Sequence, residues 1–355
     1  SRVLSAQSKY RGLIVTGIGG AGKTTTVKAS VRQTLFETNF DLRYDDVLWL
    51  NCENKGAGEI LMSLAVECGV DHNQPMKNIE FFIRKKLQEM VVLLILDGVD
   101  ELEYVRFLLG LLNKKSKLIV SSRNIPSKAF LAELCFTHHK LNSGLSFAQI
   151  ETVSKNITGI SPQEKDRGAM LKLKKSTGGL PLAWVILSSL ILETQESWVN
   201  LQNRFRFDML ESGTSSTKHN SIRASLQLSY DELHSKHKTA AMLFSLLGLF
   251  NFHDIPLPLL QSIYVHLGSS SSFEEDLAVL VRYGLVDVHT KGDVRFVTIH
   301  ALVARYARSF SEEISVDRLI YRYIQMSGKT FGLFTQIKVK KEGFGDIVPF
   351  RGDVL

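Results

Sequence analysis

Cysteine is scarce in this chain, and its scarcity limits the cross-links and metal sites that the chain can build. The sequence of 355 residues contains three cysteines, far apart at Cys52, Cys68 and Cys135. A disulfide-rich scaffold needs a larger, closely spaced set, and a zinc ribbon needs C-x-x-C pairs. Neither pattern is present, so the sequence predicts a protein of a reducing compartment.

Long hydrophobic runs are also missing. The most apolar stretch, residues 180–192, is interrupted by Pro181 and two serines and is shorter than the ~20 residues that span a bilayer. The chain opens on polar residues and shows no signal peptide. We therefore expect a cytoplasmic protein with no membrane partner.

Positive charge is in excess, but without the pattern of a nucleic-acid binder. The formal net charge is +7, and lysines gather in short runs at 114–117, 172–175 and 338–341. These runs lack the interleaved aromatic side chains on which bases stack. They are typical of solvated surfaces, and we do not expect a nucleic-acid partner.

The first third of the chain alternates apolar runs with helical patterns. We expect strands at residues 13–16, 47–51, 91–96, 118–121 and 136–141. This alternation predicts a parallel sheet covered by helices, and the wholly apolar run at 91–96 is typical of a central strand. We assign residues 1–143 to an α/β domain of the P-loop NTPase type.

A glycine-rich loop follows the first of these strands. Residues 17–24 read G-x-x-x-x-G-K-T and precede a helical pattern. Such a loop wraps its backbone N–H groups around a phosphate, while Lys23 supplies a positive charge and the Thr24 hydroxyl binds Mg²⁺. The alternative is an ordinary turn between strand and helix. The predicted phosphate ligands are Gly17, Gly19, Gly20, Ala21, Gly22, Lys23, Thr24 and Thr25.

Carboxylates follow the expected strand at 91–96. Asp97 is placed to hold Mg²⁺, and either Asp100 or Glu101 could polarise an attacking water. Together with Lys23 they are the candidate catalytic residues. The alternative is an acidic turn that ends a strand.

Arg123 follows the expected strand at 118–121. An arginine at this edge of a sheet can reach the γ-phosphate of ATP and report its presence. A surface arginine that caps the strand is the other interpretation.

Beyond residue 143 helical patterns replace strands. Ser146 begins a capping box, Ser161 begins a second one with Pro162 at the first helical position, and Pro181 starts a third helix. These signals predict a small helical domain over residues 144–213.

The next segment combines helices with a hairpin. Helical patterns at 222–233, 239–249, 257–267 and 273–283 precede two short strands at 285–290 and 294–299. This order predicts a winged-helix domain over residues 214–312. Residues 313–355 look like a partial linker or the start of a C-terminal domain.

Seven motifs along the chain share their order and spacing with one family. The sequence resembles the signal-transduction ATPases with numerous domains, in particular the NB-ARC module of plant intracellular immune receptors and animal apoptosome scaffolds. The likeness extends over residues 12–308. The motifs are GGAGKTT at 19–25, DVLWLN at 46–51, LLILD at 93–97, IVSSR at 119–123, GGLPLA at 178–183, LQLSYDEL at 226–233 and IHALV at 299–303.

The resemblance implies a role for each matching residue. Lys23 and the glycines bind phosphates, Thr24 and Asp97 anchor Mg²⁺, and Arg123 senses the γ-phosphate. Pro181 packs against the adenine or ribose, and His300 contacts the β-phosphate of ADP and latches a closed state. Taken from the residues alone, Pro181 indicates only the start of a helix. His300 then indicates a structural histidine at a strand–helix junction, with its hydrogen bonds satisfied there.

The sequence departs from the family at three places. Gly98 stands where plant members usually carry a second aspartate, so the acidic string resembles that of the NACHT ATPases and the base stays open between Asp100 and Glu101. Ala301 replaces the aspartate that follows the latch histidine, which predicts a weaker or differently built latch. The segment that helps to bind the base is not visible before Leu13, so we expect a truncated N-terminus.

These features predict the regulatory core of an NLR-like switch that is closed with ADP and opens with ATP. The open form is expected to self-associate and to act through N-terminal effector and C-terminal sensor domains outside this chain, while slow ATP hydrolysis resets it. One alternative is a winged-helix DNA-binding transcription regulator, although residues 221–233 carry a single basic residue, Arg223. Another is a high-turnover P-loop enzyme such as a kinase, for which no acceptor site is evident.

Overall fold

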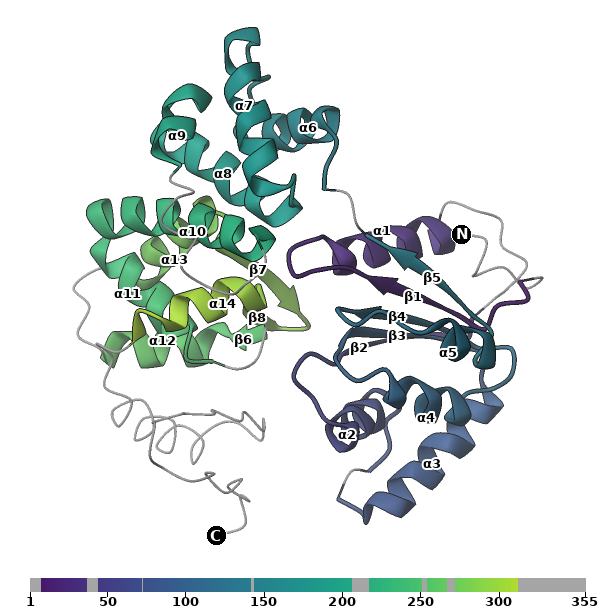
Figure 1. Cartoon of the computed structure of the whole chain (residues 1–355). Coiled ribbons are helices and arrows are strands. Elements are labelled where there is room, and N and C mark those ends of the chain that lie inside the picture. The colour runs from purple at the N-terminus through teal and green to yellow at the C-terminus, as the bar shows by residue number, and fades with distance from the viewer. Residues whose placement is uncertain are drawn as a thin grey trace. The chain divides into compact units, whose positions relative to one another are not determined.

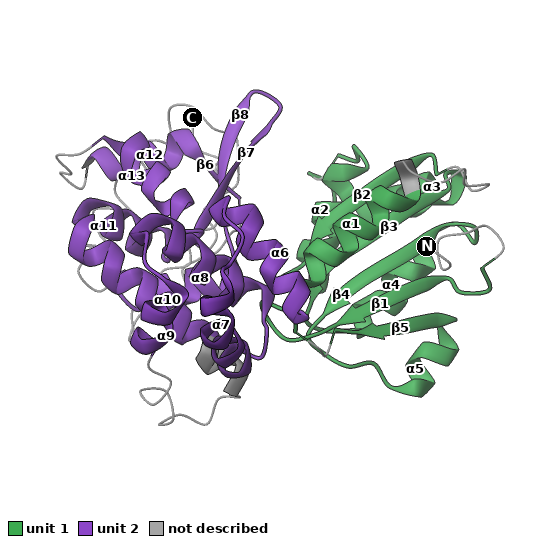
Figure 2. Cartoon of the chain, turned by 90° about the horizontal axis from the view of Figure 1, so that it is seen from above, with its two compact units in different colours: residues 1–144 green, residues 145–355 purple. Residues whose placement is uncertain are grey.

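The computed structural model describes residues 8–36, 44–71, 73–141, 144–205, 217–250, 254–266 and 272–311. The chain divides into two compact units, residues 1–144 and 145–355 (Figure 2). The expected division of the second unit at residue 213 stays a prediction, and the segment 313–355 lies outside the described residues.

The first unit contains a five-stranded parallel sheet, which confirms the predicted α/β architecture. Its strands lie in the order β2-β3-β4-β1-β5, and each overlaps one of the five predicted runs, although β3 extends beyond its run. The strands are β1 (Gly12–Thr16), β2 (Asp46–Asn51), β3 (Val92–Val99), β4 (Lys117–Ser122) and β5 (Phe136–Lys140). The helices that join them are α1 (Lys23–Phe36), α2 (Ala57–Glu67), α3 (Met76–Glu89), α4 (Glu103–Leu111) and α5 (Lys128–Glu133).

Helices cover both faces of this sheet, as a parallel sheet with apolar strands requires. On one face, Val27 and Val31 of α1 pack against Val15, Ile95 and Ile119 of the strands. Apolar side chains of α2, α3, α4 and α5 pack on the other face, and Figure 1 shows α2, α3 and α4 opposite α1. The sheet is therefore a buried platform, and the carboxyl ends of its strands lie at one edge.

Strand β3 is longer than its apolar run. It continues through Asp97 to Val99, with a shift of register against β4 between Leu96 and Val99. The Ser121 hydroxyl accepts a hydrogen bond from the Gly98 N–H at 2.8 Å. The expectation that the strand ends before Asp97 is therefore wrong, because side chains of β4 take over the pairing where the backbone ladder is interrupted.

The second unit begins with α6 (Phe147–Thr158), α7 (Glu164–Thr177), α8 (Pro181–Thr194) and α9 (Trp198–Arg204). The capping box at Ser146 is confirmed. The second predicted box is wrong, because α7 begins at Glu164 after an N-cap at Gln163. The Asp166 carboxylate accepts from the Gln163 N–H at 3.3 Å and so fixes the first turn further along the chain.

The rest of this unit combines helices with a small antiparallel sheet. The hairpin of β7 (Val286–Lys291) and β8 (Val294–Ile299) is confirmed, and its turn contains Gly292 with φ at +60°. A short strand that the sequence did not predict, β6 (Asp254–Pro256), pairs with β8. The helices are α10 (Thr217–Lys236), α11 (Lys238–Leu247), α12 (Leu257–His266), α13 (Phe273–Arg282) and α14 (Ala301–Arg308). Among the described helices, none has the length and apolar character needed to cross a bilayer.

Candidate functional site

The glycine-rich loop lies between β1 and α1, in the strand–loop–helix setting that defines a P-loop. Gly20 and Gly22 have φ angles of +75° and +84°, a region that side chains disfavour. The amides of the first turn of α1 have no partner within the helix, and the helix dipole makes this end positive. The first unit is thus an α/β domain whose glycine-rich loop has the strand–loop–helix geometry of a P-loop.

Lys23, the first residue of α1, folds back over the loop. Its ammonium donates to the carbonyl oxygens of Gly17 at 2.9 Å and of Ile18 at 3.2 Å. Burial lowers the pKa of Lys23, the nearby Arg123 lowers it further, and Glu53 and Asp97 act in the opposite sense. An anion at the loop would favour the charged form of this half-buried lysine.

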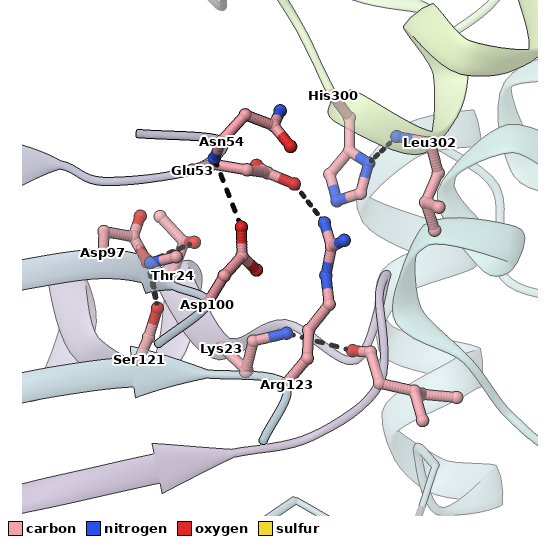
Figure 3. A network of polar contacts seen from close by, with 12 residues as sticks. Lys23, Thr24, Glu53, Asn54, Asp97, Asp100, Ser121, Arg123, His300 and Leu302 are labelled. Carbon is pink, nitrogen blue, oxygen red and sulfur yellow. Dashed lines mark hydrogen bonds and ion pairs between the residues drawn. The ribbon is translucent and has the colours of Figure 1, made fainter. Parts of the chain in front are cut away.

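Asp97 lies at the centre of a hydrogen-bond cluster formed by two strands and a helix (Figure 3). Its Oδ1 accepts from the Thr24 hydroxyl at 3.0 Å and also from the Ser121 hydroxyl. Ser121 in turn accepts from the Gly98 N–H. The two predicted Mg²⁺ ligands are therefore adjacent, and Ser121 holds the carboxylate in position.

The donor set suits Mg²⁺ only in the company of a phosphate. In the described part of the chain, no group of three or more His, Cys, Asp or Glu side chains could hold a metal ion. Mg²⁺ does not need such a group in a nucleotide site, because it takes one or two protein oxygens and completes its shell with phosphate oxygens and water. Thr24 and Asp97, in mutual contact, supply that small set.

The structure separates the two candidate bases. Asp100 is half-buried, and its Oδ2 accepts from the Asn54 N–H at 3.3 Å, while its carbonyl oxygen accepts from the Asn124 side chain. Glu101 is exposed and accepts a hydrogen bond from Tyr104, which raises the pKa of that phenol. Asp100 is thus tied to the segments that follow β2 and β4, whereas Glu101 contacts the first turn of α4.

Arg123, directly after β4, forms an ion pair with Glu53, which follows β2 (Figure 3). The Glu53 side chain is 16% exposed and that of Arg123 is 45% exposed. Sequence reasoning missed both Glu53 and Ser121. The signal for Glu53 was its place just beyond a strand of a parallel sheet, and for Ser121 it was a hydroxyl at the carboxyl end of a buried strand.

Two predicted site residues belong to the second unit. Pro181 is the half-buried first residue of α8. His300 is the exposed N-cap of α14, and its Nδ1 accepts from the Leu302 N–H at 3.2 Å (Figure 3). Each therefore has a local role in starting a helix, and the nucleotide contacts expected of them stay predictions.

No model of a known protein family matches the sequence, and no curated protein matches it significantly. Among solved structures, the chain is similar to one in the structure of Drosophila ORC bound to DNA, with 15% identity over 88% of this chain and 81% of that chain and a TM-score of 0.38. It is also similar to one in the structure of Drosophila ORC bound to AT-rich DNA and Cdc6, with 12% identity, 91% and 88% coverage and a TM-score of 0.29. A likeness this distant carries no argument about function.

Proposed function

We propose that this chain is a molecular switch that binds ADP or ATP with Mg²⁺. The observation that carries the proposal is the cluster of Lys23, Thr24 and Asp97 around a P-loop at the carboxyl edge of a parallel sheet. A positive helix end, a half-buried ammonium and a hydroxyl–carboxylate pair are together suited to a phosphate chain and its metal ion.

Each group has a distinct task in binding. The loop amides and Lys23 hold the β-phosphate, and Thr24 and Asp97 hold Mg²⁺, which neutralises phosphate charge when it is bound. Lys23 leaves the carbonyl oxygens of Gly17 and Ile18, because a phosphate is the stronger partner for an ammonium.

The switch depends on contacts that differ between the two nucleotides. With ATP, Arg123 contacts the γ-phosphate, which ADP lacks. With ADP, Pro181 and His300 supply the closed-state contacts to base and β-phosphate that the resemblance implies, and these are lost when the chain opens. A ligand shifts a conformational equilibrium only by its differential affinity for the two states, and a full reversal needs about 5.5 kcal/mol. Hydrogen bonds to charged groups contribute about 1.5–3 kcal/mol each, so two to four such contacts suffice.

We further propose that the chain is the regulatory core of an NLR-like signalling ATPase that self-associates when ATP is bound. The support is the ordered set of seven motifs, from the P-loop to IHALV at 299–303. Hydrolysis is slow and resets the switch. Asp100 activates the water, since Glu101 is exposed and accepts the Tyr104 hydrogen bond.

The test is to identify the nucleotide that the purified chain releases on denaturation. We expect ADP from the wild-type chain and its loss from Lys23→Ala, because burial of phosphate charge at the loop needs the ammonium. Lys28→Ala is the matched control, since Lys28 is an exposed lysine on the same helix. Wild-type amounts of ADP in a folded Lys23→Ala variant would rule out the phosphate-loop assignment.

A further inference from the structure

The ion pair of Glu53 and Arg123 connects the segments that follow two strands of the sheet, β2 and β4. Glu53 is the more buried partner. A carboxylate that is largely removed from water needs a cation or hydrogen-bond donors to offset its desolvation. Arg123 provides the cation, so the two side chains stabilise each other in the absence of any ligand.

The residue before Glu53 pairs with the backbone of β3, and Glu53 itself bonds to the last side chain of β2. The N–H of Cys52 donates to the Asp97 carbonyl oxygen at 2.7 Å, and the Glu53 N–H donates to Asn51 Oδ1 at 3.1 Å. The backbone of Glu53 is therefore fixed beside the sheet, and its carboxylate pairs with Arg123 from there.

Gly98 permits this close approach. Its φ is +80°, and a Cβ built there would lie 3.0 Å from Glu53 Cβ and 3.4 Å from the Glu53 nitrogen. This is the position at which the sequence departs from the aspartate of plant NB-ARC proteins. A side chain at this position would crowd Glu53, so glycine leaves room for the residue that carries the carboxylate of the ion pair.

The pair also lies within electrostatic range of the P-loop. Burial lowers the pKa of Lys23, and the charge of Arg123 lowers it further. The charge of Glu53 raises the pKa of Lys23. Glu53 and Arg123 therefore both act on the group that is proposed to hold the β-phosphate. A γ-phosphate bound next to Lys23 would offer Arg123 a second anionic partner.

We infer that Glu53 sets the preference of the site between nucleoside diphosphates and triphosphates by competing with the γ-phosphate for Arg123. This inference rests on the proposed function. With a diphosphate the ion pair stays intact, so binding leaves Arg123 where it is. With a triphosphate, Arg123 leaves Glu53 to contact the γ-phosphate. The free energy needed to break the ion pair therefore weakens triphosphate binding and leaves diphosphate binding unchanged.

The experiment is titration calorimetry on the full chain with Mg·ADP and with Mg·ATPγS, a slowly hydrolysed triphosphate. Glu53→Gln keeps the shape of the side chain and removes its charge. We expect it to tighten ATPγS binding about fivefold relative to ADP, the upper end for a partly exposed ion pair. Glu89→Gln, at an exposed glutamate at the end of α3, changes the net charge equally and should leave the ratio unchanged.

Arg123→Gln tests whether Glu53 acts through the arginine. In that background Glu53→Gln should change the ratio by less than about twofold, because no cation remains to be released. Thermal unfolding of each variant checks that it is folded.

The possible outcomes separate this inference from the proposed function. If the wild-type chain binds ADP through Lys23 but Glu53→Gln leaves the ratio unchanged, the role of Glu53 is refuted and the switch stands. If Glu53→Gln shifts the ratio of ATPγS to ADP affinity equally in the Arg123→Gln background, Glu53 does not act by competing with the γ-phosphate for Arg123. If the wild-type chain binds neither nucleotide, the proposed function and the inference both fail.

Discussion

Replacing Gly98 by alanine should destabilise the first unit more than a comparable replacement elsewhere. Two features of Gly98 disfavour a side chain. Its φ is +80°, and an added Cβ would lie 3.0 Å from Glu53 Cβ. A non-glycine residue in this conformation costs about 1 kcal/mol, and overpacking adds at least about 1 kcal/mol. We therefore expect Gly98→Ala to lower the free energy of unfolding by about 2–3 kcal/mol, through conformational strain and crowding together.

Gly69→Ala is the matched control. Gly69 belongs to the same unit and has a φ of +64°, but the nearest atom to an added Cβ is the Lys86 ammonium, 4.0 Å away and in ordinary van der Waals contact. It should show the conformational cost of about 1 kcal/mol without the crowding. Differential scanning calorimetry should give Gly98→Ala a lower melting temperature than Gly69→Ala. We expect a difference of about 2–4 °C for each kcal/mol by which Gly98→Ala loses more unfolding free energy. Equal melting temperatures would falsify the packing argument for Gly98.

Two further predictions concern buried hydroxyls of the same unit. Ser121→Ala removes a donor to Asp97 and leaves the Gly98 N–H without its acceptor. We therefore expect it to lower the free energy of unfolding by about 1–3 kcal/mol and to weaken the Mg²⁺ dependence of ADP binding. An unchanged Mg²⁺ dependence would count against Ser121 as the residue that positions Asp97. His138 contacts the buried Thr16 hydroxyl at 2.7 Å, and burial, Lys140 and His139 lower its pKa. Because the unfolded chain binds this proton more readily, stability should fall as pH decreases below about 6.5. Denaturant titrations at several pH values should show a smaller loss in His138→Gln, and an identical loss would mean that other groups are responsible.

Much of the fold could be predicted because its signals are local. The run at 92–96 is apolar throughout since β3 is buried on both faces, and the hairpin is marked by Gly292 between two alternating segments. Strand β6 could not be predicted, because three residues ending in proline carry no strand signal. It forms through its pairing with β8, which is a tertiary effect.

The candidate site divides in the same way. Lys23 and Thr24 belong to one contiguous motif, and Asp97 follows one apolar run, so residue order was sufficient to predict their proximity. Glu53 and Ser121 acquire their partners from the strand order β2-β3-β4, which no local pattern specifies. Asp100 and Glu101 could not be told apart from the sequence either. They are neighbours at nearly the same spacing from Asp97, and it is their contacts in the folded chain that distinguish them.

The packing of α1 has a consequence for how stability and ligand affinity are linked. Within the described residues, α1 is the helix whose side chains join the core on its face of the sheet, and its first turn completes the P-loop. An anion bound at that turn would stabilise the folded state by about 2.7 kcal/mol at a hundred times its dissociation constant. Anion binding and the packing of α1 are therefore thermodynamically linked. A substitution that weakens the packing of α1 against the sheet should also weaken the binding of phosphate.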